Sequence, residues 1–202
     1  MTEPARSPVL AGNSTAPAPV AKKPLGKTLL GIVGSIGAVA ALFTMTPAEE
    51  SGRKVDAHVN ADGIATLRHV AGPQYLTAYR DIVGVVTICD GDTTDVKVGQ
   101  VASPAECTAR LERQLIVHAE GVVACVPQLY GREHQVTAAV LFAYNIGVRG
   151  FCGSTAARLF RAGRWADGCR AFGMWNKAGG RVVRGLTLRR GRETAECLRG
   201  LA

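Results

Sequence analysis

Three aspartates, Asp81, Asp90 and Asp92, lie within one short segment of the sequence, YRDIVGVVTICDGDT. Carboxylates that come close together can perform acid–base chemistry, because repulsion between their charges pushes one of them toward its protonated form. The protonated carboxyl can then act as a general acid, and the ionised one as a base or a charge stabiliser. Aspartate is also common in turns, so solvated turn residues are the alternative interpretation.

The segment that carries these aspartates is expected to be a β-hairpin. β-branched residues occupy positions 82–83 and 85–88, Gly84 interrupts them and Gly91 closes the run, which predicts strand, turn and strand. We predict no other substantial β-structure. A short helix is expected over Asp62–Ala71, where apolar residues recur at three- and four-residue steps.

A long helix and a helical second half should follow the hairpin. Ser103, Pro104 and Glu106 form a helix start, with a capping hydroxyl, a proline in the first turn and a glutamate three residues after the cap. This helix should run to about Ala124 and end before Pro127, and residues 132–198 indicate several short helices broken by glycines. The expected fold class is therefore α+β: a small lobe with a hairpin, a connecting helix and a mostly helical second lobe. A cleft between two such lobes suits an extended ligand.

The N-terminal part differs in composition from the rest. Residues 1–27 are rich in Pro, Ala and Ser, which predicts a disordered cytoplasmic tail. Residues 28–46 contain no charge, and nineteen residues just reach across a bilayer, so this stretch is predicted to be a transmembrane or signal-anchor helix. Lysines before it and acids after it predict that the C-terminal side faces the periplasm. Residues 47–61 would be a linker and residues 62–202 the globular domain. The helix is rich in Gly and Ala, which leaves cleavage, retention and release from the membrane all open.

Charge and cysteines narrow the function classes. The net charge of +8 favours polyanions, and eleven basic residues against three acids lie between Arg158 and the C-terminus. No zinc-finger spacing or basic, aromatic-interleaved strand is present, so we expect no nucleic-acid partner, and we expect neither a metal site nor a cofactor. Six scattered cysteines favour disulfides in an oxidising compartment over buried free thiols. Of the fifteen pairings we favour Cys89–Cys107, Cys125–Cys152 and Cys169–Cys197.

Several motifs in order resemble the phage lysozyme family of glycosidases, particularly its members with a signal-anchor-release helix. The main match is Ala78-Tyr79-Arg80-Asp81 with Thr87 six residues after the aspartate. Further matches are Pro104-Ala105-Glu106-Cys107, Ala143-Tyr144-Asn145-Ile146-Gly147, Gly153-Ser154-Thr155, Trp175-Asn176-Lys177-Ala178-Gly179-Gly180 and Gly185-Leu186 followed by Arg189-Arg190 and Glu193. The resemblance covers roughly Ile64 to the C-terminus and implies the two-lobed phage-lysozyme fold.

The resemblance also implies site residues. Asp81 would be the ionised carboxylate that activates water or stabilises positive charge on the sugar, and Thr87 would help to hold the water. Asn145, Trp175, Asn176 and Lys177 would grip the glycan, although the same aromatic spacing also suits a core.

The family's acid glutamate should precede Gly72, but that position holds Ala71. The remaining candidates for the proton donor are Asp92, Asp90 and His69, each with a structural role as its alternative.

These expectations define two functions. The first is an endolysin, a muramidase that hydrolyses the glycan strands of bacterial peptidoglycan during host lysis. It would be a monomer, belong to a phage or prophage of a Gram-negative host, and be anchored in the inner membrane through residues 28–46 with its catalytic domain in the periplasm or released there. The second is a catalytically impaired, lysozyme-like protein that binds peptidoglycan without cutting it, since the acid glutamate is absent at Ala71 and Gly72.

Overall fold

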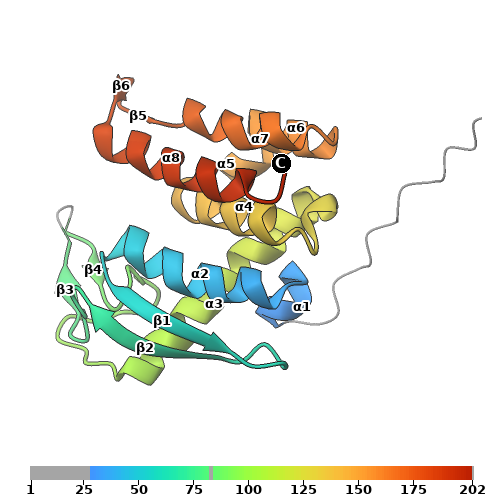
Figure 1. Ribbon diagram of the computed structural model, residues 1–202. Coiled ribbons are helices and arrows are strands. Elements are labelled where there is room, and N and C mark those ends of the chain that lie inside the picture. Colours follow the sequence, from blue (N-terminus) through green and yellow to red (C-terminus); the bar gives the residue numbers. More distant parts are fainter. Residues whose placement is uncertain (1–27, 82–83, 202) are drawn as a thin grey trace, which may run out of the picture.

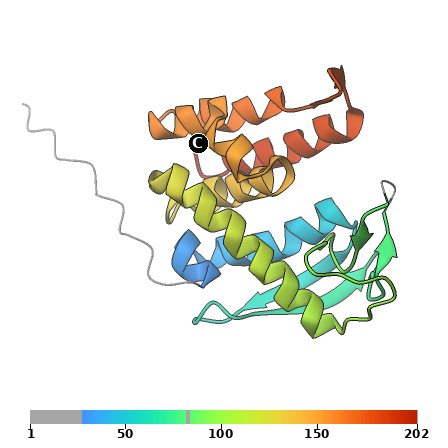
Figure 2. The ribbon, with the colours of Figure 1, turned by 180° about the vertical axis from the view of Figure 1, so that it is seen from behind.

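The computed structural model describes residues 28–81 and 84–201, which form two halves connected by one long helix (Figures 1 and 2). One half holds α1 (Leu29–Val33), α2 (Ile36–Glu50), β1 (Lys54–Val59), β2 (Ala65–Ala71), β3 (Tyr79–Arg80) and β4 (Val86–Thr87). The connecting helix is α3 (Pro104–Cys125), which runs diagonally behind the molecule. The other half holds η1 (Pro127–Leu129), α4 (Glu133–Ile146), α5 (Val148–Cys152), α6 (Thr155–Arg161), α7 (Trp165–Arg170), η2 (Ala171–Met174), β5 (Lys177–Ala178), β6 (Arg181–Val182) and α8 (Arg184–Leu198). This confirms the α+β, two-lobed prediction.

The uncharged stretch 28–46 does not form one membrane-length helix, which corrects the prediction made from the sequence. Gly34 ends α1 in the left-handed conformation (φ +75°), and the Ser35 hydroxyl caps α2 by accepting from the Ala38 amide. Apolar side chains of both helices are buried in the main core together with those of α3 and α4, for example Val39 and Phe43. Among the described residues, no helix combines the length and the apolar character that a membrane crossing requires. The tail 1–27 lies outside the described residues.

Residues 47–71 also differ from the prediction. Instead of a linker and a short helix, the chain completes α2 and then forms an antiparallel hairpin, β1–β2, in which His58 pairs with Thr66. Alternate residues such as Val55, Ala57 and Leu67 turn toward the core, which is the period of a strand. Contacts between α2 and β1 hold this hairpin along the helix (Figure 1). Packing against α2 therefore selects the extended form.

The remaining local predictions are confirmed. The strands β3 and β4 pair antiparallel, with Tyr79 opposite Thr87. The helix α3 begins with the predicted capping box, in which Ser103 and Glu106 each accept a hydrogen bond from the other's backbone amide. All three favoured disulfides form, Cys89–Cys107 in the hairpin half and Cys125–Cys152 and Cys169–Cys197 in the helical half.

Candidate active site

A glutamate that the sequence analysis did not consider stands where the two halves meet. Glu50 is the last residue of α2, and its Oε1 accepts a hydrogen bond of 2.6 Å from Nη2 of Arg189 in α8. On its other side lies the turn after β4, since a Cβ built on Gly91 would lie 3.9 Å from the Glu50 Cβ. The Glu50 side chain is 22 % exposed. It thus bridges a hairpin turn of one half and a helix of the other while it remains open to solvent.

Arg189 belongs to a buried charge cluster in α8. Its Nε donates to Oε1 of Glu193 at 3.2 Å, and Nη2 of Arg190 donates to the same oxygen at 2.7 Å. Arg190 also donates to Oδ1 of Asn145 at 3.0 Å, and its guanidinium lies over the Phe142 ring. Burial raises the pKa of Glu193 to about 7, although both arginines favour its ionised form. The cluster fixes the arginine that reaches Glu50.

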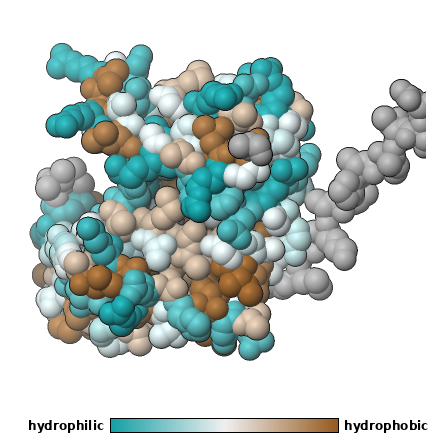
Figure 3. Space-filling view, in the orientation of Figure 1, coloured by the Kyte–Doolittle hydropathy of each residue, from teal (hydrophilic) through white to brown (hydrophobic). Residues whose placement is uncertain are grey.

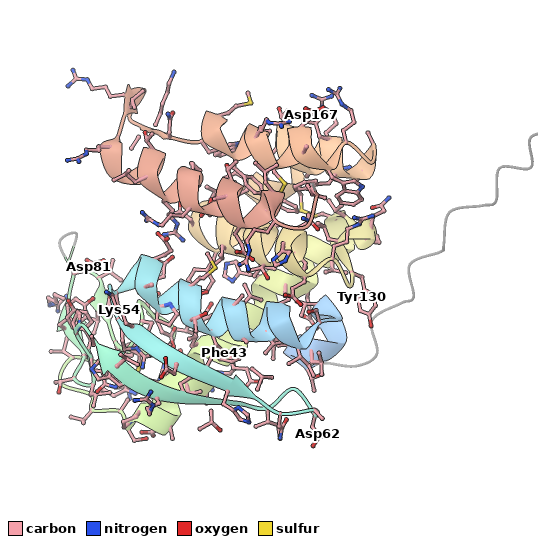
Figure 4. All side chains as sticks on the ribbon, viewed as in Figure 1. Phe43, Lys54, Asp62, Asp81, Tyr130 and Asp167 are labelled. Atoms are coloured by element: carbon pink, nitrogen blue, oxygen red, sulfur yellow. A yellow bond between two sulfur atoms is a disulfide. The ribbon has the colours of Figure 1, made fainter. Side chains whose placement is uncertain are left out.

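Asp81 directly follows β3 at the start of the β3–β4 loop, and Thr87 is the last residue of β4, opposite Tyr79. The Asp81 carboxylate accepts from the Val85 amide at 2.8 Å, and the Asp81 amide donates to the Val85 carbonyl at 2.9 Å. Thr87 is buried, and its hydroxyl lies 3.2 Å from the Val85 carbonyl oxygen. Figure 4 shows Asp81 at the edge of the hairpin half, on the side where α2 ends. Asp81 therefore lies on the side of the molecule where α2 ends with Glu50.

The three proton donors predicted from the sequence, Asp90, Asp92 and His69, have surroundings that differ from those of Glu50. Asp90 forms a buried, bidentate ion pair with Arg53. Asp92 pairs with Arg110 at 2.8 Å; burial opposes its ionised form, but hydrogen bonds from Thr94 and Arg110 lower its pKa overall. A carboxyl whose pKa is lowered is a poor proton donor near neutral pH.

His69 lies exposed on β2, opposite Val55. His69 belongs to the exposed β1–β2 hairpin, whereas Asp90 and Asp92 are paired with Arg53 and Arg110, so we assign the proton donor to none of these three residues.

The acidic residues around Glu50 share one neighbour, Tyr144 of α4. Burial raises the Tyr144 pKa most, and the negative charges of Glu50, Asp90 and Asp92 raise it further. Glu50, Asp90 and Asp92 therefore share the electrostatic environment of the Tyr144 hydroxyl. The molecular outline is indented on this side, between the half with β5 and β6 and the half with β3 and β4 (Figure 3).

The predicted glycan-gripping residues lie in the helical half. Trp175 is 38 % exposed and packs edge-on against Phe142, with ring centroids 5.9 Å apart. The Asn176 carbonyl accepts from the Val183 amide at 2.9 Å, which closes the base of the β5–β6 hairpin. Lys177 is exposed on that hairpin, opposite Val182. Trp175 thus serves the core and still offers one face to solvent.

The sequence around Glu50 resembles the expected acid motif, but Glu50 lies much farther from Asp81 along the chain than the motif requires. Glu50 is followed by Ser51 and Gly52, a close variant of the glutamate–glycine pair sought before Gly72. The β1–β2 hairpin is inserted after it, so 31 positions separate Glu50 from Asp81, whereas Ala71, the position where the acid was sought, lies ten positions before Asp81. Ala71, the position first assigned to the missing acid, is the last residue of β2.

A glutamate at the end of α2 and an aspartate at the start of the β3–β4 loop supply two carboxyl groups, the kind of pair that a glycoside hydrolase uses. The chain belongs to the phage lysozyme family, whose model matches residues 72–193.

The relatives agree with this assignment. The chain is 40 % identical over 127 residues to a SAR-endolysin of Pseudomonas phage phiKMV. The matched region covers 60 % of this chain and 78 % of the relative. It is similar in structure to a variant of P22 lysozyme, with a TM-score of 0.53 and 30 % identity over 62 % of this chain and 88 % of that one. An endolysin from Escherichia coli O157:H7 phage FAHEc1 shares the fold, with a TM-score of 0.60 and 22 % identity over 83 % of this chain and 93 % of that one. The family match begins at Gly72, so α2 and Glu50 precede it.

Proposed function

We propose that this protein is an endolysin that hydrolyses the glycan strands of bacterial peptidoglycan, a muramidase acting in host cell lysis. It is a glycoside hydrolase of the phage lysozyme family. The observation that carries the proposal is the position of Glu50, which lies between the turn after β4 and Arg189 of the opposite half. That position supplies the acid that a hydrolytic mechanism requires.

In the proposed mechanism Glu50 protonates the glycosidic oxygen that leaves. Arg189 holds the Glu50 carboxylate through Oε1, and Glu193 in turn orients Arg189. Asp81, ionised on the hairpin loop, activates a water or stabilises the positive charge that develops on the sugar ring, and the Thr87 hydroxyl helps to place that water. No cofactor takes part in these steps.

The substrate would lie along the indentation between the halves. Trp175 offers an apolar ring face on which a sugar can stack, and Asn176 and Lys177 stand beside it with polar groups for sugar hydroxyls and acidic substituents. Asn145 already accepts from Arg190, so its amide nitrogen is the group that would donate to the glycan. The protein would act as a monomer.

Residues 28–46 would have two successive environments. Several relatives bear the name SAR-endolysin, among them those of Pseudomonas phage phiKMV and Enterobacteria phage P21. The segment is uncharged and long enough for a bilayer, which supports an initial place in the inner membrane of a Gram-negative host. In the fold described above it forms α1 and α2, which favours a released, periplasmic enzyme as the active form.

The alternative function, a wall-binding protein without activity, loses its basis. It depended on the absence of an acid at Ala71 and Gly72, and these residues lie at the end of a strand instead of at the end of a helix. Glu50 takes the helix-end position.

Glu50→Gln tests the function, with Glu49→Gln as a matched control one residue away on the same helix. Glu49 pairs with Arg192 on the surface of α8. We expect Glu50→Gln to lower the release of reducing ends from purified Gram-negative cell walls by about 10² to 10⁴, the usual loss for a general acid. Glu49→Gln should retain the parent rate within about threefold, because the side-chain carbonyl of glutamine can still accept a hydrogen bond from Arg192, whose own side chain is 54 % exposed. A Glu50→Gln variant with parent activity would refute the proposal.

A further inference from the structure

Three polar side chains join the end of α2 to the turn that follows β4. Nε and Nη2 of Arg53 donate to the two carboxylate oxygens of Asp90, with Nε–Oδ1 at 2.9 Å and Nη2–Oδ2 at 2.5 Å. The Ser51 hydroxyl lies 2.8 Å from Asp90 Oδ1 and 3.0 Å from the Pro47 carbonyl oxygen. We call Ser51, Arg53 and Asp90 the exit clamp. It bonds a turn of the hairpin half to the exit of the helix that carries Glu50.

The ion pair at the centre of the exit clamp is buried, and Ser51 beside it is half-buried. The side chains of Arg53 and Asp90 are 5 % and 4 % exposed. A buried ion pair adds little net stability compared with apolar residues of the same shape, but either charge alone would be strongly unfavourable. Such a pair therefore favours one arrangement of the two segments over all others. Its effect is on geometry more than on the free energy of unfolding.

Both ends of the exit clamp adjoin Glu50. Ser51 follows Glu50 directly, and Asp90 precedes Gly91, where a built Cβ would lie 3.9 Å from the Glu50 Cβ. The turn itself is closed by two hydrogen bonds between Ile88 and Asp92 backbones, at 2.9 and 3.0 Å. The carboxylate of Glu50 is thus held between a rigid turn and Arg189.

The inserted hairpin separates Glu50 from Asp81 along the chain. After Gly52, which adopts φ +74°, the chain leaves for β1 and β2 and returns at Gly72. Pairing of Lys54 with Ala71 brings the two ends of this hairpin together, and the exit clamp joins their junction to the turn after β4. Ser51 and Arg53 also precede the family match at Gly72, so two of the three residues lie outside it.

We propose that Ser51, Arg53 and Asp90 are positioning residues that hold Glu50 at the reacting bond. The inference rests on the proposed role of Glu50 as the acid. Asp90, considered from the sequence as a proton donor, acts through Glu50 and does not itself touch the substrate. A displacement of about 1 Å at the acid is enough to cost about 10²-fold in rate.

The first test is Asp90→Asn in the full chain, measured as rate against concentration of purified cell wall. We expect the maximal rate to fall by about 10- to 100-fold while the half-saturating wall concentration stays within about twofold, because binding groups are untouched. Asp56→Asn is the matched control, since Asp56 pairs with Arg68 on the exposed face of the β1–β2 hairpin. It should leave both quantities unchanged.

A combined variant separates positioning from a general structural role. In a Glu50→Gln background, Asp90→Asn should cause no further loss of rate, because the group that it positions is gone. If it lowers the residual rate of Glu50→Gln by the same factor as in the parent, the positioning role is wrong. If Glu50→Gln alone has parent activity, the proposed function fails instead, so the two failures are distinguishable.

Ser51→Ala keeps the proposal testable if Asp90→Asn does not fold. It removes one hydrogen bond and leaves the Arg53–Asp90 pair intact, so the thermal midpoint should change by no more than about 4 °C. We expect the maximal rate to fall by about 3- to 10-fold with the same half-saturating wall concentration. A Ser51→Ala variant with the parent rate would overturn the proposal.

Discussion

Gly34→Ala should destabilise the protein strongly if α1 and α2 are part of the folded enzyme. Gly34 turns the chain between the two helices with φ +75°. A Cβ at this position would lie 2.9 Å from Cζ of Tyr130 and 3.0 Å from the Gly131 amide nitrogen. That amide donates to the Val33 carbonyl at 2.9 Å, so the backbone on the far side cannot simply move away. In a membrane-spanning helix the same substitution would meet no such obstacle.

The expected loss has two parts. The left-handed conformation costs a non-glycine residue roughly 1–2 kcal/mol. Crowding against Tyr130 and the Gly131 backbone should add about 1–3 kcal/mol. We therefore expect Gly34→Ala to lower the free energy of unfolding by about 2–5 kcal/mol.

Gly99→Ala isolates the first part. Gly99 has nearly the same dihedral, φ +78°, but nothing lies within 4 Å of a Cβ built there. It should cost only about 1–2 kcal/mol. Urea unfolding of the full chain, followed by tryptophan fluorescence, would measure both variants. Equal losses in the two variants would show that Gly34 is not packed against Tyr130, and the burial of α1 and α2 described here would be wrong.

Three further outcomes are expected. Burial raises the pKa of Glu193 from 4.5 to about 7, so the folded protein binds the proton more tightly than the unfolded chain. The free energy of unfolding of the parent should therefore fall by about 3 kcal/mol relative to that of Glu193→Gln as pH rises from 4.5 to 7. Urea unfolding of both proteins across this range measures the difference, and an equal pH dependence of the two would contradict the prediction. Replacing Cys89 and Cys107 by serine removes a disulfide with a sequence separation of 18. The double variant should lose about 3 kcal/mol of its free energy of unfolding. Urea unfolding measures this loss, and an unchanged midpoint would be the contrary result. Ala71→Glu should leave the wall-cleaving rate within about twofold, since Ala71 ends an exposed strand; a tenfold gain would mean that an acid is missing there after all.

The parts of the fold that the sequence predicts correctly depend on local signals. The capping box at Ser103 and Glu106 satisfies the first amides of α3 from within four residues, so no distant contact is needed to define that helix start. The β3–β4 hairpin follows from β-branched residues on either side of Gly84. Each disulfide joins two cysteines that are neighbours in sequence order, with separations of 18, 27 and 28 residues, so the favoured pairing follows the order of the chain.

The parts that the sequence predicts wrongly depend on contacts far along the chain. Ala65 and Leu67 pack toward the core from β2, yet the spacing of apolar residues from Ile64 onward also fits a short helix. The packing of the hairpin against α2 favours the strand over the helix for these residues. Residues 28–46 are ambiguous for a related reason, since a helix buried in a protein core and one buried in lipid need the same uncharged composition.

The insertion of β1 and β2 changes the spacing of the active-site motif, although an acidic residue, Glu50, is still present. A motif defined by spacing assumes that the chain between two catalytic groups has a fixed length, and β1–β2 breaks that assumption between Glu50 and Asp81. What stays recognisable is the local context of the acid: a glutamate that ends an apolar helix shortly before a glycine with positive φ, here Gly52. Since a hydrolytic site depends on where two carboxylates stand in space, the length of chain between them is free to vary as long as other contacts restore their separation. In this protein the pairing of β1 with β2 brings the ends of the insertion together, and the proposed role of the exit clamp is to hold the end of α2, and with it Glu50, against the turn after β4.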